Sequence, residues 1–295
     1  MLDPLVIVFG LGVGVLIGLT GIGGGSLMTP LLILFAGVQP VVAIGTDLAY
    51  GAITKTVGGW RHLKKGTVDL GVSKWLAVGS MPGSLVGVWV ADRYAHDAQD
   101  ALLYVIAAVL LVVAVSILFR AMFLRKAIER EQHSVEMTTG RQATAVAIGA
   151  VLGFALGMTS VGSGALIGLA LILVFRLTPH RVVGTDVFHA AILLWTAGIA
   201  HWIGGNVDFT LMGNILIGSL PGVWLGTHLI DKVPAEGLRP ALGCVLLGSA
   251  LGVFTKAGVD LPVWTIAGVP AIAGAVAYLL HRSRNRHPLP EGAPA

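Results

Sequence analysis

Apolar runs separated by short charged islands make up almost the whole chain. Runs of about 17–25 apolar residues have the length of a helix that crosses the hydrocarbon core of a membrane. The pattern therefore predicts an all-α polytopic membrane protein with five apolar segments in each half and one more at the end. The expected segments are 4–19, 26–38, 41–60, 70–91 and 101–124, then 143–158, 164–176, 181–203, 209–230 and 238–256, and finally 262–280.

Composition supports lipid as the main solvent of this chain. Of its 295 residues 55% are hydrophobic and only 12% are charged, whereas soluble domains carry about 25% charged residues. The single cysteine, Cys244, excludes an intramolecular disulfide. No metal-ligand spacing and no phosphate-binding loop occurs, so we expect no metal, no cofactor and no nucleotide-driven step. The net charge of +4 is explained by the islands and the tail, and no nucleic-acid partner is expected.

The two halves of the chain repeat one another without a gap. Gly45-Thr46-Asp47 recurs as Gly184-Thr185-Asp186, an offset of 184 − 45 = 139 residues, and a Gly-Ser-x-Pro-Gly element at 79–83 recurs at 218–222 with the same offset. The predicted organisation is a first membrane repeat (1–124), a cytoplasmic linker (125–142), a second membrane repeat (143–256), an extra C-terminal transmembrane helix (257–281) and a disordered cytoplasmic tail (282–295).

Loop charges predict that the two repeats have opposite orientations. Lys and Arg accumulate on the cytoplasmic side of membrane proteins. The loop at 61–65 carries Arg61, Lys64 and Lys65, whereas the equivalent loop of the second half has Asp208 and neither Lys nor Arg. Inverted repeats are the architecture of alternating-access transporters. We therefore expect a multi-pass membrane protein with a cytoplasmic C-terminus.

Each repeat has a glycine-rich break between its first two segments, at 20–26 and 159–164. A helix start presents unpaired N–H groups and a partial positive charge, and glycine lets a ligand approach the backbone. Two opposed starts predict a site for a small oxyanion; glycine-mediated helix packing is the alternative. The candidate binding residues are Thr20, Gly21, Gly23, Gly24, Gly25, Ser26, Thr159, Ser160, Gly162, Ser163 and Gly164.

The segments beside these breaks are short, and two arrangements stay open. The segment at 26–38 has about 13 residues, too few to cross about 30 Å at 1.5 Å per residue. We favour re-entrant hairpins that meet near the midplane over pairs of short tilted crossings.

Polar residues inside the third segments are candidates for coupling or gating, because ionisable groups in a membrane span are costly. Asp47 and Asp186 carry a coupled proton, orient the glycine breaks, or merely cap their helices. Lys55 either balances an anion or, as we favour, extends to the membrane surface. His189 is a proton carrier or a core residue, while His62 and His201 are expected at the interface. The full set is Thr46, Asp47, Tyr50, Lys55, Thr185, Asp186 and His189.

The glycine motif at 18–27, Gly-Leu-Thr-Gly-Ile-Gly-Gly-Gly-Ser-Leu, resembles the sulfite exporter TauE/SafE family, as do the paired Gly-Thr-Asp, Ser-Met-Pro-Gly and Ser-Leu-Pro-Gly elements. The resemblance covers about residues 4–256. It implies an inner-membrane carrier of sulfite, sulfonates or related sulfur anions. The second motif, at 160–164, matches more loosely, so the identity of the substrate follows from the likeness, whereas a small anion also follows from the helix breaks.

Together these features predict a secondary transporter for a small sulfur oxyanion, sulfite in the first place or an organosulfonate, working as an exporter. An anion channel or uniporter with the same site is the nearest alternative. The paired aspartates Asp47 and Asp186 also raise a distant alternative, an intramembrane aspartyl protease, since such enzymes share a proton between two carboxylates. We expect no enzymatic activity. The expected partners are the anion and the lipid bilayer, and a homodimer stays open.

Overall fold

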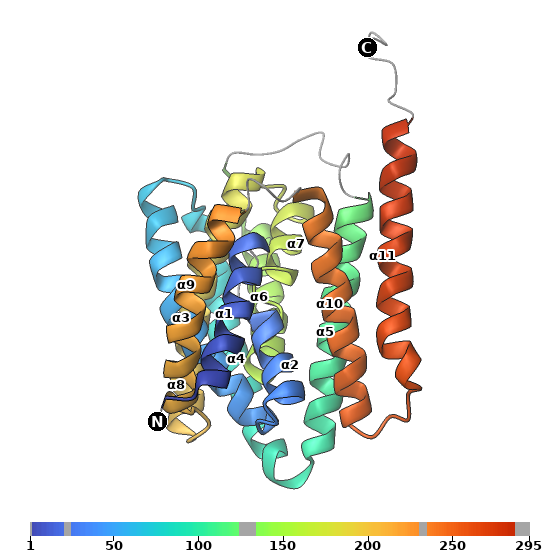
Figure 1. The fold of residues 1–295 in the computed structure, drawn as a ribbon. Helices are drawn as coiled ribbons and strands as arrows, with labels where there is room; N and C mark the ends of the chain where they lie inside the picture. Colours follow the sequence, from blue (N-terminus) through green and yellow to red (C-terminus); the bar gives the residue numbers. More distant parts are fainter. Residues whose placement is uncertain (1, 21–24, 124–133, 230–234, 287–295) are drawn as a thin grey trace.

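The computed structural model describes residues 2–20, 25–123, 134–229 and 235–286. These residues form eleven helices and no strand, as the apolar pattern predicts (Figure 1). The first half contains α1 (Pro4–Thr20), α2 (Gly25–Phe35), α3 (Pro40–Lys64), α4 (Leu70–Asp97) and α5 (Gln99–Phe123). The second contains α6 (Thr139–Thr159), α7 (Leu166–Leu173), α8 (Pro179–Ile203), α9 (Phe209–Leu229), α10 (Ala235–Lys256) and α11 (Val263–Arg286).

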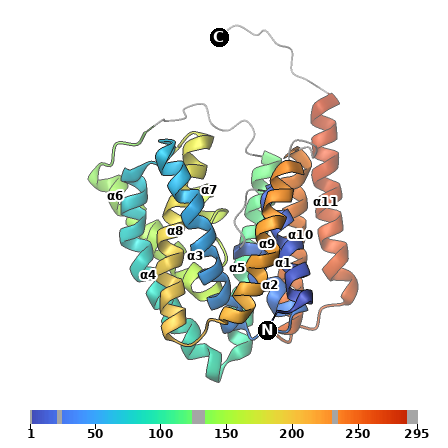
Figure 2. The same cartoon turned by 60° about the vertical axis from the view of Figure 1, so that its left-hand side comes forward.

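The helices run between two faces of the molecule (Figures 1 and 2). One face, at the top of Figure 1, carries the loop at 65–69 and the start of α6; we call it the linker face. The other carries the start of α1 and the loops at 204–208 and 257–262; we call it the N-terminal face. The pair α1 and α2 starts and ends at the N-terminal face, whereas the pair α6 and α7 starts and ends at the linker face.

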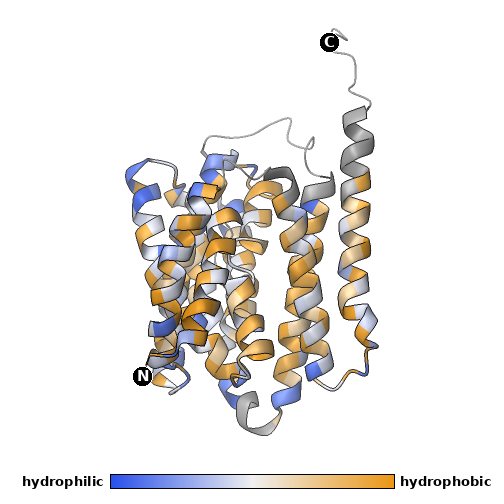
Figure 3. Ribbon diagram, in the orientation of Figure 1, coloured by the Kyte–Doolittle hydropathy of each residue, from blue (hydrophilic) through white to orange (hydrophobic). Residues whose placement is uncertain are grey.

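The helices have the composition of a polytopic membrane protein. Four described helices are long and apolar enough to cross a membrane: Gln99–Arg120, Thr139–Thr159, Pro179–Ile203 and Phe209–Leu229. Apolar residues predominate along α5, α10 and α11 in Figure 3. Large apolar side chains such as Trp89 and Trp224 also point outward, as expected where lipid is the solvent.

Two seams of glycine hold the halves together. In α4, Gly79, Gly83 and Gly87 are four residues apart and face α6 so closely that an added Cβ would lie 2.0–2.3 Å from a backbone oxygen of that helix. In α9, Gly218, Gly222 and Gly226 face α1 in the same way, at 1.9–2.4 Å. Small residues spaced by four let helix backbones approach this closely. The fourth helix of each half thus packs on the first helix of the other.

The first two residues of each Gly-Thr-Asp motif tie a third helix to a loop of the opposite half. The Thr46 hydroxyl accepts a hydrogen bond from the Asp208 amide (3.0 Å), and the Thr185 hydroxyl accepts one from the Asp69 amide (2.8 Å). The two bonds are related by the repeat, since 185 − 46 and 208 − 69 both equal 139. Beside them, a Cβ on Gly45 would lie 2.1 Å from the Asn206 carbonyl oxygen. The motif therefore fixes how α3 and α8 meet their neighbours, and it leaves its aspartate for another role.

Candidate functional site

Asp47 joins α2 to the second glycine break. Its Oδ2 accepts hydrogen bonds from the hydroxyls of Thr29 (2.7 Å) and Ser160 (2.8 Å), and the residue is only 1% exposed. Of the alternatives left open for this aspartate, capping of its helix is excluded, because α3 begins at Pro40 and its N-cap is Gln39. Asp47 lies in the second turn and faces inward. Of the roles considered for it, orientation of the break is the one that these contacts support.

The second break is a tight left-handed turn between α6 and α7. Ser160 ends α6 with φ of 59°, and Gly162 and Gly164 follow with φ of 113° and 96°. Glycine is the residue that adopts these angles without strain. The turn points the amide of Gly164 at Oδ1 of Asp186, which accepts its hydrogen bond at 3.1 Å. Each aspartate of the repeated motif thus contacts the second break, one through a hydroxyl and the other through the backbone.

The start of α2 lies directly against this turn. A Cβ added to Gly25 would lie 2.7 Å from the carbonyl oxygen of Ser160 and 3.6–3.7 Å from the hydroxyls of Ser160 and Ser163. The next residue, Ser26, is buried, and its hydroxyl has no hydrogen-bond partner among the described residues. The end of the first break and the whole second break therefore meet in the interior. Gly21, Gly23 and Gly24 lie outside the described residues, as does the side chain of Thr20.

Lys55 points into this meeting point. The lysine is 8% exposed, and its Nζ donates a hydrogen bond to the Ser163 hydroxyl at 3.4 Å. Its positive charge also interacts electrostatically with the carboxylates of Asp47 and Asp186. The favoured prediction, a lysine extended to the membrane surface, is wrong. Lys55 is two turns after Asp47 on the same helix face, and that face packs on the break.

Arg120 is a second cation beside the site, and the sequence analysis missed it. It lies near the end of α5, where its guanidinium donates a hydrogen bond to the carbonyl oxygen of Ala165 just before α7 (3.4 Å). Its positive charge also interacts electrostatically with the carboxylate of Asp186. In the sequence it stands at the end of an apolar run, close to the basic residues of the linker. No signal in the sequence marks it, because α5 approaches α7 only in the folded protein.

Comparison with known proteins gives a family match over most of the chain. The family model of the sulfite exporter TauE/SafE matches residues 6–253. The chain belongs to this family. It is similar to the probable membrane transporter protein YjnA of Bacillus subtilis (strain 168), with 37% identity over 249 residues, 83% of this chain and 97% of that protein. The probable membrane transporter protein MJ0441 of Methanocaldococcus jannaschii is 24% identical over 271 residues, 86% of this chain and 94% of that protein. No solved structure matches the chain.

Further polar residues of this TauE/SafE protein come in pairs related by the repeat. Nε2 of His189 lies 2.9 Å from the Ser80 hydroxyl, while Tyr50, the equivalent of His189, lies beside Ser219, the equivalent of Ser80. All four side chains are buried. The serines belong to the repeated Gly-Ser-x-Pro-Gly elements, which the sequence analysis used as evidence of repetition and not as part of the site. The recurrence of this element in both halves was the sequence signal that would have marked the serines as candidates.

Two other predicted residues of the TauE/SafE protein are used structurally. The hydroxyl of Thr159 donates to the Ala155 carbonyl oxygen (2.7 Å) and accepts from the Val161 amide (3.2 Å), so it supports the turn. His201 was expected at the interface, and that prediction is wrong. The residue is 0% exposed, and its Nε2 lies 3.0 Å from the carbonyl oxygen of Gly157. It holds α8 against the end of α6.

Proposed function

We propose that this TauE/SafE transporter is a secondary carrier that exports a small sulfur oxyanion, sulfite in the first place, from the cytoplasm across the inner membrane. The observation that carries the proposal is the ammonium of Lys55, buried against Ser163 where the two breaks meet. A buried cation among hydroxyl and amide donors suits a small anion. The family description supports sulfite as the first candidate.

The contacts support an inverted repeat as the framework of this carrier. The glycine seams and the threonine–amide bonds recur at an offset of 139 residues, each time with the two halves exchanged. The 11 residues of α2 and the 8 residues of α7 span about 16 Å and about 12 Å at 1.5 Å per residue. Both are too short for a crossing of about 30 Å. We infer two re-entrant hairpins, entering from opposite faces.

We infer from loop charge which face of the molecule lies on which side of the membrane. Arg61, Lys64 and Lys65 end α3 at the linker face, and such residues accumulate in the cytoplasm. In this orientation the hairpin of α1 and α2 enters from outside, and the hairpin of α6 and α7 enters from the cytoplasm. The C-terminus is then cytoplasmic.

The negative charge of two carboxylates must be offset before the site can hold an anion. Asp47 and Asp186 flank the site, and a carboxylate repels an anion. Asp47 turns Oδ2 toward two hydroxyl donors, so we assign it to holding the breaks in place, with Oδ1 available for a proton. Lys55 then offsets both carboxylates when the substrate enters. The separate hydrogen-bond partners of the two aspartates favour a carrier site over a protease dyad.

The test is flux into liposomes that contain the purified protein. Sulfite, sulfate, thiosulfate and taurine are compared, and we expect sulfite to move fastest. Gly25→Ala should abolish flux, because its Cβ would press on the Ser160 carbonyl; Gly12→Ala, where a Cβ meets nothing within 4 Å, is the matched control. Preloading the liposomes with unlabelled sulfite should accelerate uptake of labelled sulfite, as in a carrier; an unchanged rate would indicate a channel. Absence of flux for all four compounds would refute the proposal.

A further inference from the structure

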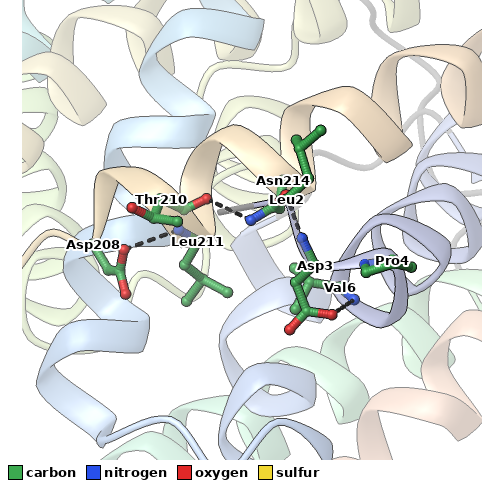
Figure 4. Close-up of a pocket in the computed structure, with 8 residues that line it drawn as sticks. All are labelled: Leu2, Asp3, Pro4, Val6, Asp208, Thr210, Leu211 and Asn214. Atoms are coloured by element: carbon green, nitrogen blue, oxygen red, sulfur yellow. Dashed lines mark hydrogen bonds between the residues drawn. The ribbon is translucent and has the colours of Figure 1, made fainter.

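A cavity of about 400 Å³ opens on the N-terminal face between the starts of α1 and α9 (Figure 4). Asp3 and Asp208 cap these two helices, since their Oδ1 atoms accept amide hydrogen bonds from Leu5 and Leu211 respectively (both 2.9 Å). Asp208 is also the residue whose amide is held by Thr46, next to Asp47 of the candidate site. The cavity is therefore connected to the site through Asp208 and Thr46. Its lining residues are Leu2, Asp3, Pro4, Val6, Asp208, Thr210, Leu211 and Asn214.

The repeat defines the corresponding place on the linker face. Subtracting 139 from Asp208, Thr210 and Leu211 gives Asp69, Gly71 and Val72 at the start of α4. Asp69 repeats the geometry of Asp208, because its amide is held by Thr185 and its Oδ1 accepts from the Val72 amide at 3.0 Å. Adding 139 to Asp3 gives Gln142 at the start of α6. If the halves were alike in every respect, a second cavity would lie here.

The end of the interrepeat linker fills that place. The amide of Val135 donates to the remaining carboxylate oxygen of Asp69 (3.2 Å), and the Val135 side chain is buried. Two residues later, Cγ of Met137 would lie 3.2 Å from a Cβ added to Gly71. The carbonyl oxygen of Met137 accepts a hydrogen bond from Nε2 of Gln142 at 2.7 Å. The linker thus contacts the equivalents of Asp208, Thr210 and Asp3, all of which line the open cavity.

We propose that residues 135–137 are a plug that closes the cavity of the linker face, and that the plug leaves when the substrate enters from this side. The inference rests on the proposed transport function. Asp69 connects the plug to two helices. Its side chain caps α4 and accepts the hydrogen bond from the plug, while its backbone amide donates a hydrogen bond to α8. Release of the plug therefore acts on the element that carries Asp186 and His189. The matching cavity on the N-terminal face has no such cover among the described residues.

Asp69→Asn releases the plug with the least disturbance. The asparagine oxygen still caps α4, whereas its NH₂ group replaces the oxygen that accepts from Val135. The full-length protein is compared in lipid nanodiscs by hydrogen exchange of the segment 134–138. We expect exchange about 10-fold to 100-fold faster, which corresponds to about 1.4 to 2.7 kcal/mol. Asp208→Asn, the repeat-related substitution without a plug, should leave this segment at the wild-type rate. Val135→Gly gives a second route to release if Asp69→Asn fails to fold.

Thiol labelling shows whether release opens the face. In a Cys244→Ser background, Leu211→Cys in the open cavity should react with a membrane-impermeant reagent. Its equivalent Val72→Cys, at a position that is 0% exposed, should stay unreactive until Asp69→Asn or Val135→Gly is added. Unchanged protection of Val72→Cys in both plug variants would overturn the proposal, as would rapid labelling in the intact protein. If the plug variants increase labelling of Val72→Cys but the protein shows no sulfite flux, the plug proposal stands and the proposed substrate is refuted.

Discussion

Replacing Lys55 by methionine removes the buried ammonium and keeps most of the side-chain volume. Nζ lies 3.4 Å from the Ser163 hydroxyl, so an anion bound by that hydroxyl lies about 4 Å from the charge. At that distance two unit charges attract by about 4 kcal/mol when the effective dielectric constant is about 20. Without substrate the ammonium already interacts with Asp47 and Asp186. We therefore take about half of the attraction, about 2 kcal/mol, as the net loss of binding free energy, or about 30-fold in Kd.

Isothermal titration of the purified protein with sulfite measures this loss. Ser163→Ala removes one hydroxyl donor to a charged acceptor and should weaken binding by about 1.5–3 kcal/mol, so both variants should lose affinity. Lys64→Met is the matched control, because Lys64 is on the same helix but exposed, with its Nζ 4.1 Å from the ring centroid of Trp60. Its affinity should equal that of the wild type. A Kd of Lys55→Met within twofold of the wild type would refute the placement of the anion beside Lys55.

Three further predictions concern coupling, packing and orientation. Asp47→Asn should flatten the pH dependence of sulfite flux, because an amide takes up no proton; an unchanged profile in the liposome assay would leave Asp47 a purely structural residue. Gly153→Ala should destabilise the protein by about 1–3 kcal/mol through overpacking, because its Cβ would lie 2.3 Å from a backbone oxygen of α4; thermal unfolding should show no comparable loss for Gly213→Ala, which meets nothing within 4 Å. In intact cells, an impermeant thiol reagent should label Asp260→Cys from outside and should not label Lys65→Cys; the reverse pattern would invert the assigned orientation.

Several features of this protein follow from the sequence because they depend on local or periodic information. The eleven helices are visible as apolar runs, since the length of a membrane helix is set by the bilayer and by the rise per residue. The Gly-Thr-Asp motif and its copy 139 residues later mark equivalent positions in the two halves. Gly162 and Gly164, which have positive φ, were identified as a helix break because glycine is the residue that tolerates such a turn.

Tertiary structure decided which of these elements meet. The glycines of α4 predict a close helix contact, but their spacing does not say that the partner is α6 of the other half. A lysine side chain is long enough to reach either the membrane surface or the interior, so Lys55 was settled by the packing of α3 on the second break. Likewise, Val135 is one apolar residue in a polar linker, and its contact with Asp69 depends on two segments that are far apart in the chain. A repeat in sequence determines which residues are equivalent, whereas burial and pairing depend on contacts between the halves, and these exist only once the chain has folded.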